Sequence, residues 1–314
     1  MSVFIVAEMS CNHMGILDKA KQIIECSADA GADAVKISLD DPNGGLTINH
    51  ESDDFRIKSG PWEGKYLHDF YSETHTPWRW VPELMGHAKK NGIELFATVS
   101  CEEGVRFCED VGMPRYKVSS YEACDIPLIR AIKETGKPVI VSCGMDWHDA
   151  WDELQGYDAS FLYCVSDYPA SVDKFDLSAI EDFDGISDHS LDDAIVFAAV
   201  ARGAKIVERH IMLVGDTPED YWFSDVPEDF ANMVEGIRTI ERAMEPRAFV
   251  APNTALCKSL YAVEDIAKGE KFTRENMRSI RPGNGLHPRE YFRVLGCVAK
   301  HDIKRGTAIK EAML

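Results

Sequence analysis

Charged residues stand within or directly after short apolar runs at several points along this 314-residue sequence. Glu8 follows the apolar run 4–7, and Lys36 and Lys117 each lie between apolar neighbours. A charge in such a position needs a partner, because burying an isolated charge is costly. Two lysines of this kind predict a binding site for an anion. We expect Glu8 to have a functional role at the same site.

Two histidines also follow apolar runs, His189 after the seventh run and His210 after the eighth. On neighbouring strands their positions would be about 5 Å apart. Two imidazoles at that spacing can share a divalent metal and leave positions open for water and substrate. The alternative is that each histidine is only hydrogen-bonded within the protein. The nine cysteines show no spacing that would complete a structural zinc site.

The elements that would position these residues form a regular repeat. Helical patterns alternate with short apolar runs, which is typical of parallel βαβ units, and eight repeats within about 240 residues predict a closed (β/α)₈ TIM barrel. In such a barrel the chemistry lies at the carboxyl ends of the strands. The expected strands are residues 4–7, 34–37, 94–98, 116–118, 139–142, 161–164, 185–187 and 205–208.

Two segments depart from the even repeat. The connection after the second strand, about residues 39–80, is long and rich in aromatic residues, so we expect it to be ordered and functional. The barrel domain is predicted to span residues 1–244. Residues 245–256 are predicted to be a linker, and residues 257–314 a small β-rich domain.

Composition narrows the class of protein. Lys and Arg number 34 against 53 Asp and Glu, giving a net charge of −19, which argues against binding to nucleic acid or to an anionic membrane. Residues 257–314 carry 12 basic and 7 acidic side chains and are therefore basic. An odd number of cysteines without regular spacing indicates free thiols in a reducing compartment. The N-terminus lacks the pattern of a signal peptide, so we expect a cytoplasmic protein.

Segments through almost the whole chain resemble the sialic acid synthase family. The matching segments are Ile5-Val6-Ala7-Glu8, Asn12-His13-Met14-Gly15, Ala34-Val35-Lys36, Tyr116-Lys117-Val118, Val139-Ile140-Val141-Ser142, Gly185-Ile186-Ser187-Asp188-His189 and Glu208-Arg209-His210. The segments 64–71 and 75–78 are most similar to the pseudaminic acid synthase branch. The segment Arg281-Pro282-Gly283-Asn284-Gly285 is similar to that family's antifreeze-like (SAF, β-clip) domain.

The resemblance implies an activity and a set of site residues. The family condenses phosphoenolpyruvate with an N-acetylated hexose, here expected to be a 2,4-diacetamido sugar, and releases phosphate. His189 and His210 would bind Mn²⁺ or Mg²⁺. Phosphoenolpyruvate and sugar would be bound by Lys36, Thr98, Lys117, Ser120, Ser142, Ser187 and Asn284. The reacting centre would be lined by Glu8, Glu122, Tyr168, Asp220 and Arg281, the last from the partner in a domain-swapped homodimer.

Other functions stay open from the sequence. Ser38, Val99, Ser100 and Asp167 differ from the family's usual residues, so the chain could be an N-acetylneuraminate or legionaminate synthase, or a sugar-binding homologue with altered catalysis. A carboxylate at Asp167 would repel phosphate unless a cation intervenes. A Schiff-base aldolase that uses Lys36 or Lys117 is a further possibility. No GxSxG motif supports Ser-His-Asp catalysis.

Overall fold

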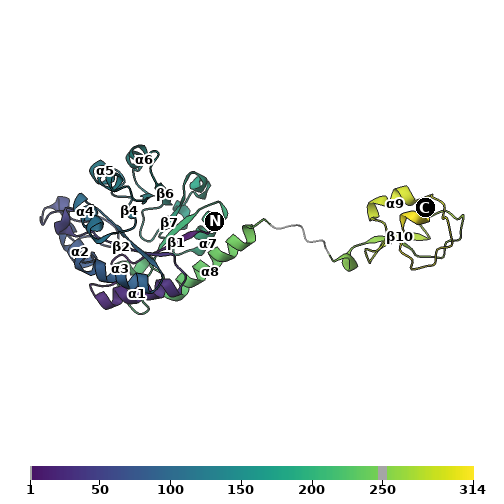
Figure 1. The fold of residues 1–314 in the computed structure, drawn as a ribbon, viewed down its shortest axis with the longest axis horizontal. Coiled ribbons are helices and arrows are strands. Elements are labelled where there is room, and N and C mark those ends of the chain that lie inside the picture. Colours follow the sequence, from purple (N-terminus) through teal and green to yellow (C-terminus); the bar gives the residue numbers. More distant parts are fainter. Residues whose placement is uncertain (1, 247–252) are drawn as a thin grey trace. The chain divides into compact units, whose positions relative to one another are not determined.

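The protein is described here by a computed structural model that covers residues 2–246 and 253–314. Half of the predicted linker, residues 247–252, lies outside the described residues. Contacts between residues divide the chain into two compact units, Met1–Glu245 and Pro246–Leu314. Figure 1 shows a ring of strands and surrounding helices in the first unit, and a small unit with little helix at the other end of the chain.

Eight parallel strands close into a barrel in sequence order, which confirms the predicted fold. Each strand is rich in apolar and β-branched residues because both of its faces are covered. Glu8 pairs in register with Lys36 on one side and with His210 on the other. These three residues therefore lie at the same height along the barrel axis. The strands are β1 (Phe4–Glu8), β2 (Ala34–Ser38), β3 (Glu94–Thr98), β4 (Tyr116–Val118), β5 (Val139–Cys143), β6 (Ala159–Cys164), β7 (Gly185–Asp188) and β8 (Ile206–His210).

Helices surround the barrel and bury one face each. In α1, Ala20, Ile23 and Ile24 are fully buried at helical spacing. The helix α5 shows how local sequence sets helix ends, since the Asp125 side chain caps its start and Gly136 ends it in the left-handed conformation. The helices of this unit are α1 (Leu17–Asp29), α2 (Leu67–Thr74), α3 (Val81–Lys90), α4 (Glu102–Val111), α5 (Ile126–Thr135), α6 (His148–Glu153), α7 (Asp193–Ala201) and α8 (Pro227–Met244).

The long connection between β2 and α3 is folded over the carboxyl ends of the strands. The Thr76 backbone N–H donates to the Ser38 carbonyl at 3.0 Å, and Trp78 stacks on Phe107 with ring centroids 4.9 Å apart. The Trp62 ring packs against Phe70 with ring centroids 5.2 Å apart. The first two contacts tie the connection to β2 and to α4, and the third packs the connection against its own helix α2.

A buried ion cluster lies on the outer face of β7 and β8. Arg209 is only 1% exposed and faces Asp188, Asp193 and Asp225, with its Nη1 2.6 Å from Asp193 Oδ1. Asp188 and Arg209 directly precede His189 and His210. The cluster therefore ties together the two strand ends that present the histidines.

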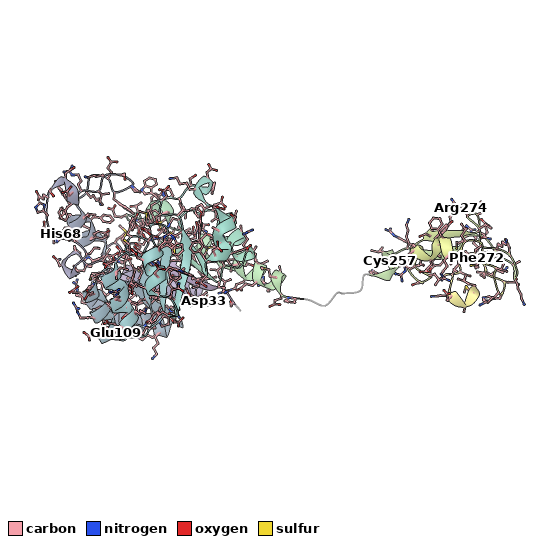
Figure 2. All side chains as sticks on the ribbon, turned by 90° about the horizontal axis from the view of Figure 1, so that it is seen from above. Asp33, His68, Glu109, Cys257, Phe272 and Arg274 are labelled. Carbon is pink, nitrogen blue, oxygen red and sulfur yellow. The ribbon has the colours of Figure 1, made fainter. Side chains whose placement is uncertain are left out.

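The second unit is a small β-rich fold. It contains the antiparallel pair β9 (Ser259–Ala262) and β10 (Met277–Ile280), and the short helix α9 (Tyr291–Val294). Its core includes Leu260, Met277 and Phe272, the last of which is labelled in Figure 2. A Cβ at Gly285 would lie 2.4 Å from the Leu260 carbonyl oxygen, so only glycine fits where this loop crosses β9.

Within residues 2–246 and 253–314, no helix is both long enough and apolar enough to cross a bilayer.

Candidate active site

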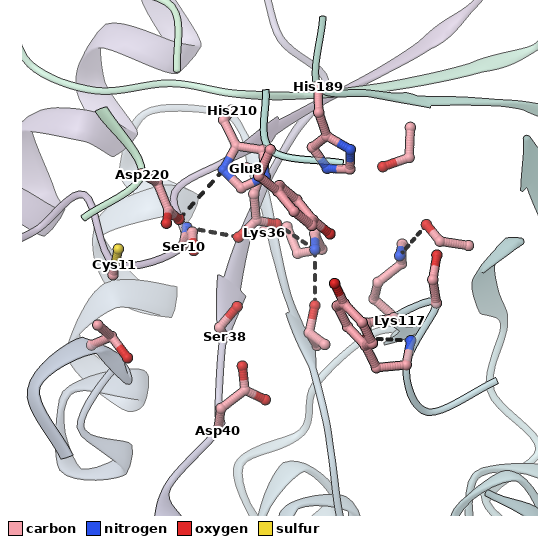
Figure 3. Close-up of a pocket in the computed structure, with 18 of the residues that line it drawn as sticks. Glu8, Ser10, Cys11, Lys36, Ser38, Asp40, Lys117, His189, His210 and Asp220 are labelled. Carbon is pink, nitrogen blue, oxygen red and sulfur yellow. Dashed lines mark hydrogen bonds and ion pairs between the residues drawn. The ribbon is translucent and has the colours of Figure 1, made fainter. Parts of the chain in front are cut away.

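A pocket opens at the carboxyl ends of the barrel strands, where the fold class places chemistry. Of the fourteen residues predicted for the site, the barrel brings twelve to the wall of this pocket (Figure 3). These twelve are Glu8, Lys36, Thr98, Lys117, Ser120, Glu122, Ser142, Tyr168, Ser187, His189, His210 and Asp220. They come from all eight strands or from the segments that follow them.

Lys36 is the centre of one buried ion network. It is 6% exposed and contacts the carboxylate of Glu8, which is 1% exposed. Its Nζ also lies 3.4 Å from Glu208 Oε1 and donates to Thr98 Oγ1 at 2.9 Å. The lysine thus has partners on three neighbouring strands, which fixes its ammonium at the floor of the pocket.

Lys117 forms a second network that meets the first at Glu208. Its Nζ donates to Ser142 Oγ at 2.7 Å and lies 3.8 Å from Glu208 Oε1. The same Glu208 oxygen accepts from Ser187 Oγ at 3.2 Å. One buried carboxylate therefore faces both lysines, and the hydroxyls of Ser142 and Ser187 remain close to the cations.

The charges in these networks shift the pKa values of their members. Burial raises the pKa of Glu8 to about 7, although the Lys36 charge opposes that rise. Burial alone would lower the pKa of Lys36, but the carboxylates of Glu208 and Glu8 raise it above its ordinary value. Burial lowers the pKa of Lys117, and Glu208 opposes that fall. Lys36 is therefore the firmly charged lysine of the two.

The two histidines face one another as predicted, with ring centroids 5.3 Å apart. His189 Nδ1 lies 3.2 Å from the Val165 carbonyl oxygen, which orients that ring. His210 Nδ1 lies 3.7 Å from Asp220 Oδ2, and this buried nitrogen has no hydrogen-bond partner. The Tyr168 ring packs against His189 with centroids 4.5 Å apart.

This donor set fits an open metal site. A buried imidazole nitrogen without a hydrogen bond is available as a ligand, and burial lowers the pKa of His210, which keeps that ring neutral. Among the described residues, no group of three or more His, Cys, Asp or Glu side chains is arranged to hold a metal ion. A metal held by His189 and His210 would therefore need ligands from water and substrate, as in catalytic rather than structural sites.

The wall formed by the β2 and β4 connections carries two further carboxylates. Asp40 lies beyond the end of β2, and Glu122 lies beyond β4, where it accepts a hydrogen bond from Ser119 Oγ. Burial raises the pKa of Glu122 to about 7, with a smaller contribution from the Asp40 charge. Tyr71 of α2 also lines this part of the pocket.

Comparison with known proteins places this site in a family. The NeuB family profile matches residues 23–248, and the SAF domain profile matches residues 258–314. The pseudaminic acid synthase of Campylobacter jejuni is 37% identical over 98% of this chain and 96% of its own length. The chain belongs to the NeuB family. This finding confirms the resemblance to the sialic acid synthase family and makes the protein a transferase-type synthase.

Other NeuB-family relatives cover the chain equally well. The N,N'-diacetyllegionaminic acid synthase of C. jejuni is 29% identical over 98% of this chain and 98% of its own length. The crystal structure of the spore coat polysaccharide biosynthesis protein SpsE of Bacillus subtilis superposes with a TM-score of 0.62 at 27% identity. It covers 98% of this chain and 94% of that protein.

Two predicted site residues of this NeuB-family chain lie in the second unit. Arg281 and Asn284 flank a turn whose Pro282 carbonyl accepts from Ser259 Oγ at 2.8 Å. The Asn284 carbonyl accepts from the Lys310 ammonium. The two units are described separately, so a role for Arg281 and Asn284 in the site stays a prediction.

The residues that differ from those usual in the family lie in different places in the structure. Ser38 lines the pocket. A serine in place of the larger side chain usual in the family therefore changes the site directly. Asp167 does not line the pocket and forms an ion pair with Lys174. Lys174 supplies the cation that was needed beside Asp167, so this carboxylate is no obstacle to binding an anion. Ser166, the residue before Asp167, does not line the pocket either.

Sequence reasoning missed two parts of the site. Glu208 was noted only within a motif, although a glutamate between Val207 and Arg209 in a buried strand carried the same signal as Glu8. Asp40 and Tyr71 belong to the long connection. No strand periodicity extends there, so their place in the pocket depends on the fold of that connection.

Proposed function

We propose that the protein condenses phosphoenolpyruvate with a 2,4-diacetamido hexose and releases phosphate, as a pseudaminic acid synthase. The observation that carries this proposal is the pair of buried lysines beside two facing histidines in one pocket. The relatives supply the branch, since three pseudaminic acid synthases are 31–37% identical to the chain. Legionaminate or N-acetylneuraminate synthesis is the alternative within the same chemistry.

The pocket floor fits a small, multiply charged anion. Lys36 and Lys117 place two ammonium groups in one pocket of a protein whose net charge is −19. The Thr98 and Ser142 hydroxyls lie within hydrogen-bond distance of these ammonium groups and could also bond to phosphate or carboxylate oxygens. We place phosphoenolpyruvate here, with Ser120 and Ser187 at the edge of its site.

The proposed reaction forms one carbon–carbon bond and breaks one carbon–oxygen bond. The methylene carbon of phosphoenolpyruvate attacks the aldehyde carbon of the open-chain sugar, and the aldehyde oxygen becomes a hydroxyl by taking up a proton. Water adds to the carbon that carries the phosphate, and phosphate leaves with its bridging oxygen. Glu8 or Glu122 accepts the proton of that water, since both have a pKa of about 7.

A divalent ion fits the histidine pair in this proposal. His189 and His210 would hold Mn²⁺ or Mg²⁺, which when bound supplies Lewis-acid stabilisation of the charge that grows on the aldehyde oxygen. Asp220 Oδ2 lies 3.7 Å from His210 Nδ1 and places a carboxylate beside the histidine pair. Tyr168 packs on His189 and limits the access of water to that side.

The properties of Lys117 leave a Schiff-base aldolase as a second candidate function. Burial lowers the pKa of Lys117, which increases the fraction of free amine that could attack a keto acid. The pKa of Lys36 is raised, so Lys36 is not suited to that role. Borohydride reduction in the presence of pyruvate would trap a covalent adduct on Lys117 if this mechanism operates.

We further propose a cytoplasmic homodimer in which the second unit of one copy completes the pocket of the other with Arg281 and Asn284. All nine cysteines carry free thiols, which supports a reducing compartment. The positive charge of residues 257–314 complements the acidic remainder of the chain.

The test is phosphate release from phosphoenolpyruvate with Mn²⁺, across 2-acetamido and 2,4-diacetamido hexoses. Release with a 2,4-diacetamido hexose, abolished by chelator and by His189→Ala, is the expected result. The His189→Ala variant should keep the mass of the wild-type assembly in size-exclusion chromatography with light scattering. A folded protein that releases no phosphate with any sugar would contradict the synthase, and an active His189→Ala variant would contradict the metal role.

A further inference from the structure

A fully buried asparagine joins the two segments that carry His210 and Asp220. Asn12 lies in the turn after β1, behind the residues that line the pocket. Its Nδ2 donates to the Ile211 carbonyl at 2.8 Å and to Ser224 Oγ at 2.9 Å. Both protons of this amide group are therefore used in hydrogen bonds to the chain at and beyond the end of β8.

Ser224 connects this amide to Asp220. A hydroxyl has one proton, and Ser224 Oγ donates it to the Asp220 carbonyl at 2.8 Å while it accepts from Asn12. Ser224 is buried, so bulk water does not compete for these bonds. The bonds fix the backbone of Asp220, and with it the position from which the carboxylate extends.

The other bond of the amide fixes the strand end that presents His210. Ile211 directly follows His210, so the bond to its carbonyl holds the chain at the end of β8. The Asp225 backbone N–H donates to the His210 carbonyl at 3.0 Å, so the segment after β8 returns to the strand end. Asp220 Oδ2 lies 3.7 Å from His210 Nδ1, and Figure 3 shows these two side chains facing one another. The amide of Asn12 therefore controls how close the carboxylate lies to the histidine.

We infer that Asn12 and Ser224 are positioning residues that strengthen ion binding by the histidine pair, because they hold Asp220 beside it. This inference rests on the proposed function, which places a divalent ion at His189 and His210. Imidazoles bind a metal in their neutral form and supply no negative charge. The buried Asp220 carboxylate supplies that charge, and its attraction for a cation is stronger than that of a carboxylate in water.

The experiment measures the Kd for Mn²⁺ by electron paramagnetic resonance of the free ion, with the full-length protein. Ser224→Ala removes the hydroxyl that bonds to the Asp220 carbonyl, so Mn²⁺ binding should weaken about tenfold. Asn12→Ala breaks the bond on the other side of that hydroxyl and should weaken it in the same direction. The affinity for phosphoenolpyruvate, measured by calorimetry without metal, should stay the same because Lys36 and Lys117 take no part in this network.

The matched control is Ser27→Ala. Ser27 is also buried, and its Oγ donates to the carbonyl four residues earlier at 2.7 Å, as Ser224 Oγ does, but it lies in α1. Ser27→Ala therefore removes the same kind of bond at a distance from the pocket. Its Kd for Mn²⁺ should match that of the wild-type protein.

A double variant separates positioning from general damage. Asp220→Asn removes the negative charge but keeps the carbonyl to which Ser224 donates. If Ser224 acts through the carboxylate, Ser224→Ala should not weaken Mn²⁺ binding further in the Asp220→Asn background. An equal loss of affinity in both backgrounds would overturn the inference, because Ser224 would then act independently of the Asp220 charge.

The outcomes also separate this inference from the proposed function. Phosphate release on the same samples tests the synthase separately. Wild-type protein that binds Mn²⁺ no better than His189→Ala would overturn the metal role and the inference together. A Ser224→Ala variant that binds Mn²⁺ as tightly as wild type would leave the metal role standing and overturn the inference. A variant that loses affinity for Mn²⁺ and phosphoenolpyruvate alike would also overturn it, since that result indicates damage to the whole pocket.

Discussion

At the scale of single residues, Glu208 explains how two buried lysines share one pocket. The carboxylate is 4% exposed and lies 3.4 Å from Lys36 and 3.8 Å from Lys117. The charges of Lys117 and Lys36 outweigh burial and lower the pKa of Glu208, so it stays ionised. Without it, Lys117 would have a neutral hydroxyl as its main side-chain partner.

Replacing Glu208 with glutamine should therefore lower the alkaline limit of the pH range in which the enzyme is active. Burial already lowers the pKa of Lys117, and Glu208 is the main group that opposes this effect. Loss of that charge lowers the pKa further, so Lys117 loses its proton at a lower pH. The alkaline limb of kcat/KM against pH should move to lower pH by about one unit or more. An unchanged alkaline limb in Glu208→Gln would show that Lys117 does not depend on this carboxylate.

At the scale of elements, a prediction from sequence places the site correctly, but the predicted strands end too early. The apolar run of β1 stops at Ala7, whereas the strand continues through Glu8, and β8 continues to His210. Polar site residues occupy the carboxyl ends of the strands. The apolar pattern used to predict a strand therefore stops before the strand itself ends. The strand order and the histidine pair follow from the repeat. The position of Asp40 does not, because it depends on a connection without periodicity.

The outer cluster on β7 and β8 makes stability depend on pH. Burial among other carboxylates raises the pKa of Asp225 from 3.8 to about 7, despite the nearby Arg209. The folded chain then holds a proton that the unfolded chain releases, so this contribution to stability is complete below about pH 4 and is lost as the pH rises through 7. The free energy of unfolding should fall by about 4 kcal/mol across that range.

Asp225→Asn tests this linkage, because asparagine keeps the shape and cannot ionise. Urea unfolding of the variant at pH 5 and pH 8 should give a smaller difference in stability than wild type gives. Asp110→Asn, which neutralises an exposed carboxylate on α4, is the matched control. An equal pH dependence in wild type and Asp225→Asn would remove Asp225 as its source.

The long connection should control acceptor binding through Trp62. This ring contacts Phe70, Tyr168 and Phe223, and its Nε1 donates to the Glu219 carbonyl at 3.3 Å. Trp62→Ala removes the ring contacts between the connection and the segment after β8, and leaves the Lys65–Glu219 ion pair in place. We expect the KM for the sugar to rise about tenfold, while the KM for phosphoenolpyruvate changes little because Lys36 and Lys117 do not touch this ring. Equal increases in both KM values would indicate general damage to the barrel mouth.

At the scale of the whole molecule, the chain divides its charge between two units. Residues 257–314 carry a net charge of +5, so the remaining residues carry −24. The barrel pocket also contains more carboxylates than lysines, since Glu8, Asp40, Glu122, Glu208 and Asp220 line it with Lys36 and Lys117. The proposed exchange of second units between copies would bring positive charge to this carboxylate-rich pocket.

Subunit complementation tests whether that charge comes from a second copy. Lys36→Met should inactivate the barrel and Arg281→Ala the second unit, so neither homodimer should be active. In a mixed dimer with exchanged second units, the intact barrel of the Arg281→Ala chain receives Arg281 from the Lys36→Met chain. One of its two sites is then complete. Random pairing of equal amounts should restore about one quarter of wild-type phosphate release, since half of the dimers are mixed.

The complementation result depends only on which chain supplies Arg281. If each chain completed its own pocket, every site in the mixed dimer would carry one of the two substitutions, and the mixture would stay inactive. Co-expression with two affinity tags isolates the mixed dimer, for which half of wild-type activity is expected. An inactive mixed dimer of correct mass would contradict the exchange, and an active Arg281→Ala homodimer would remove Arg281 from the site. Because the readout is a gain of activity, damage to folding cannot imitate the expected result.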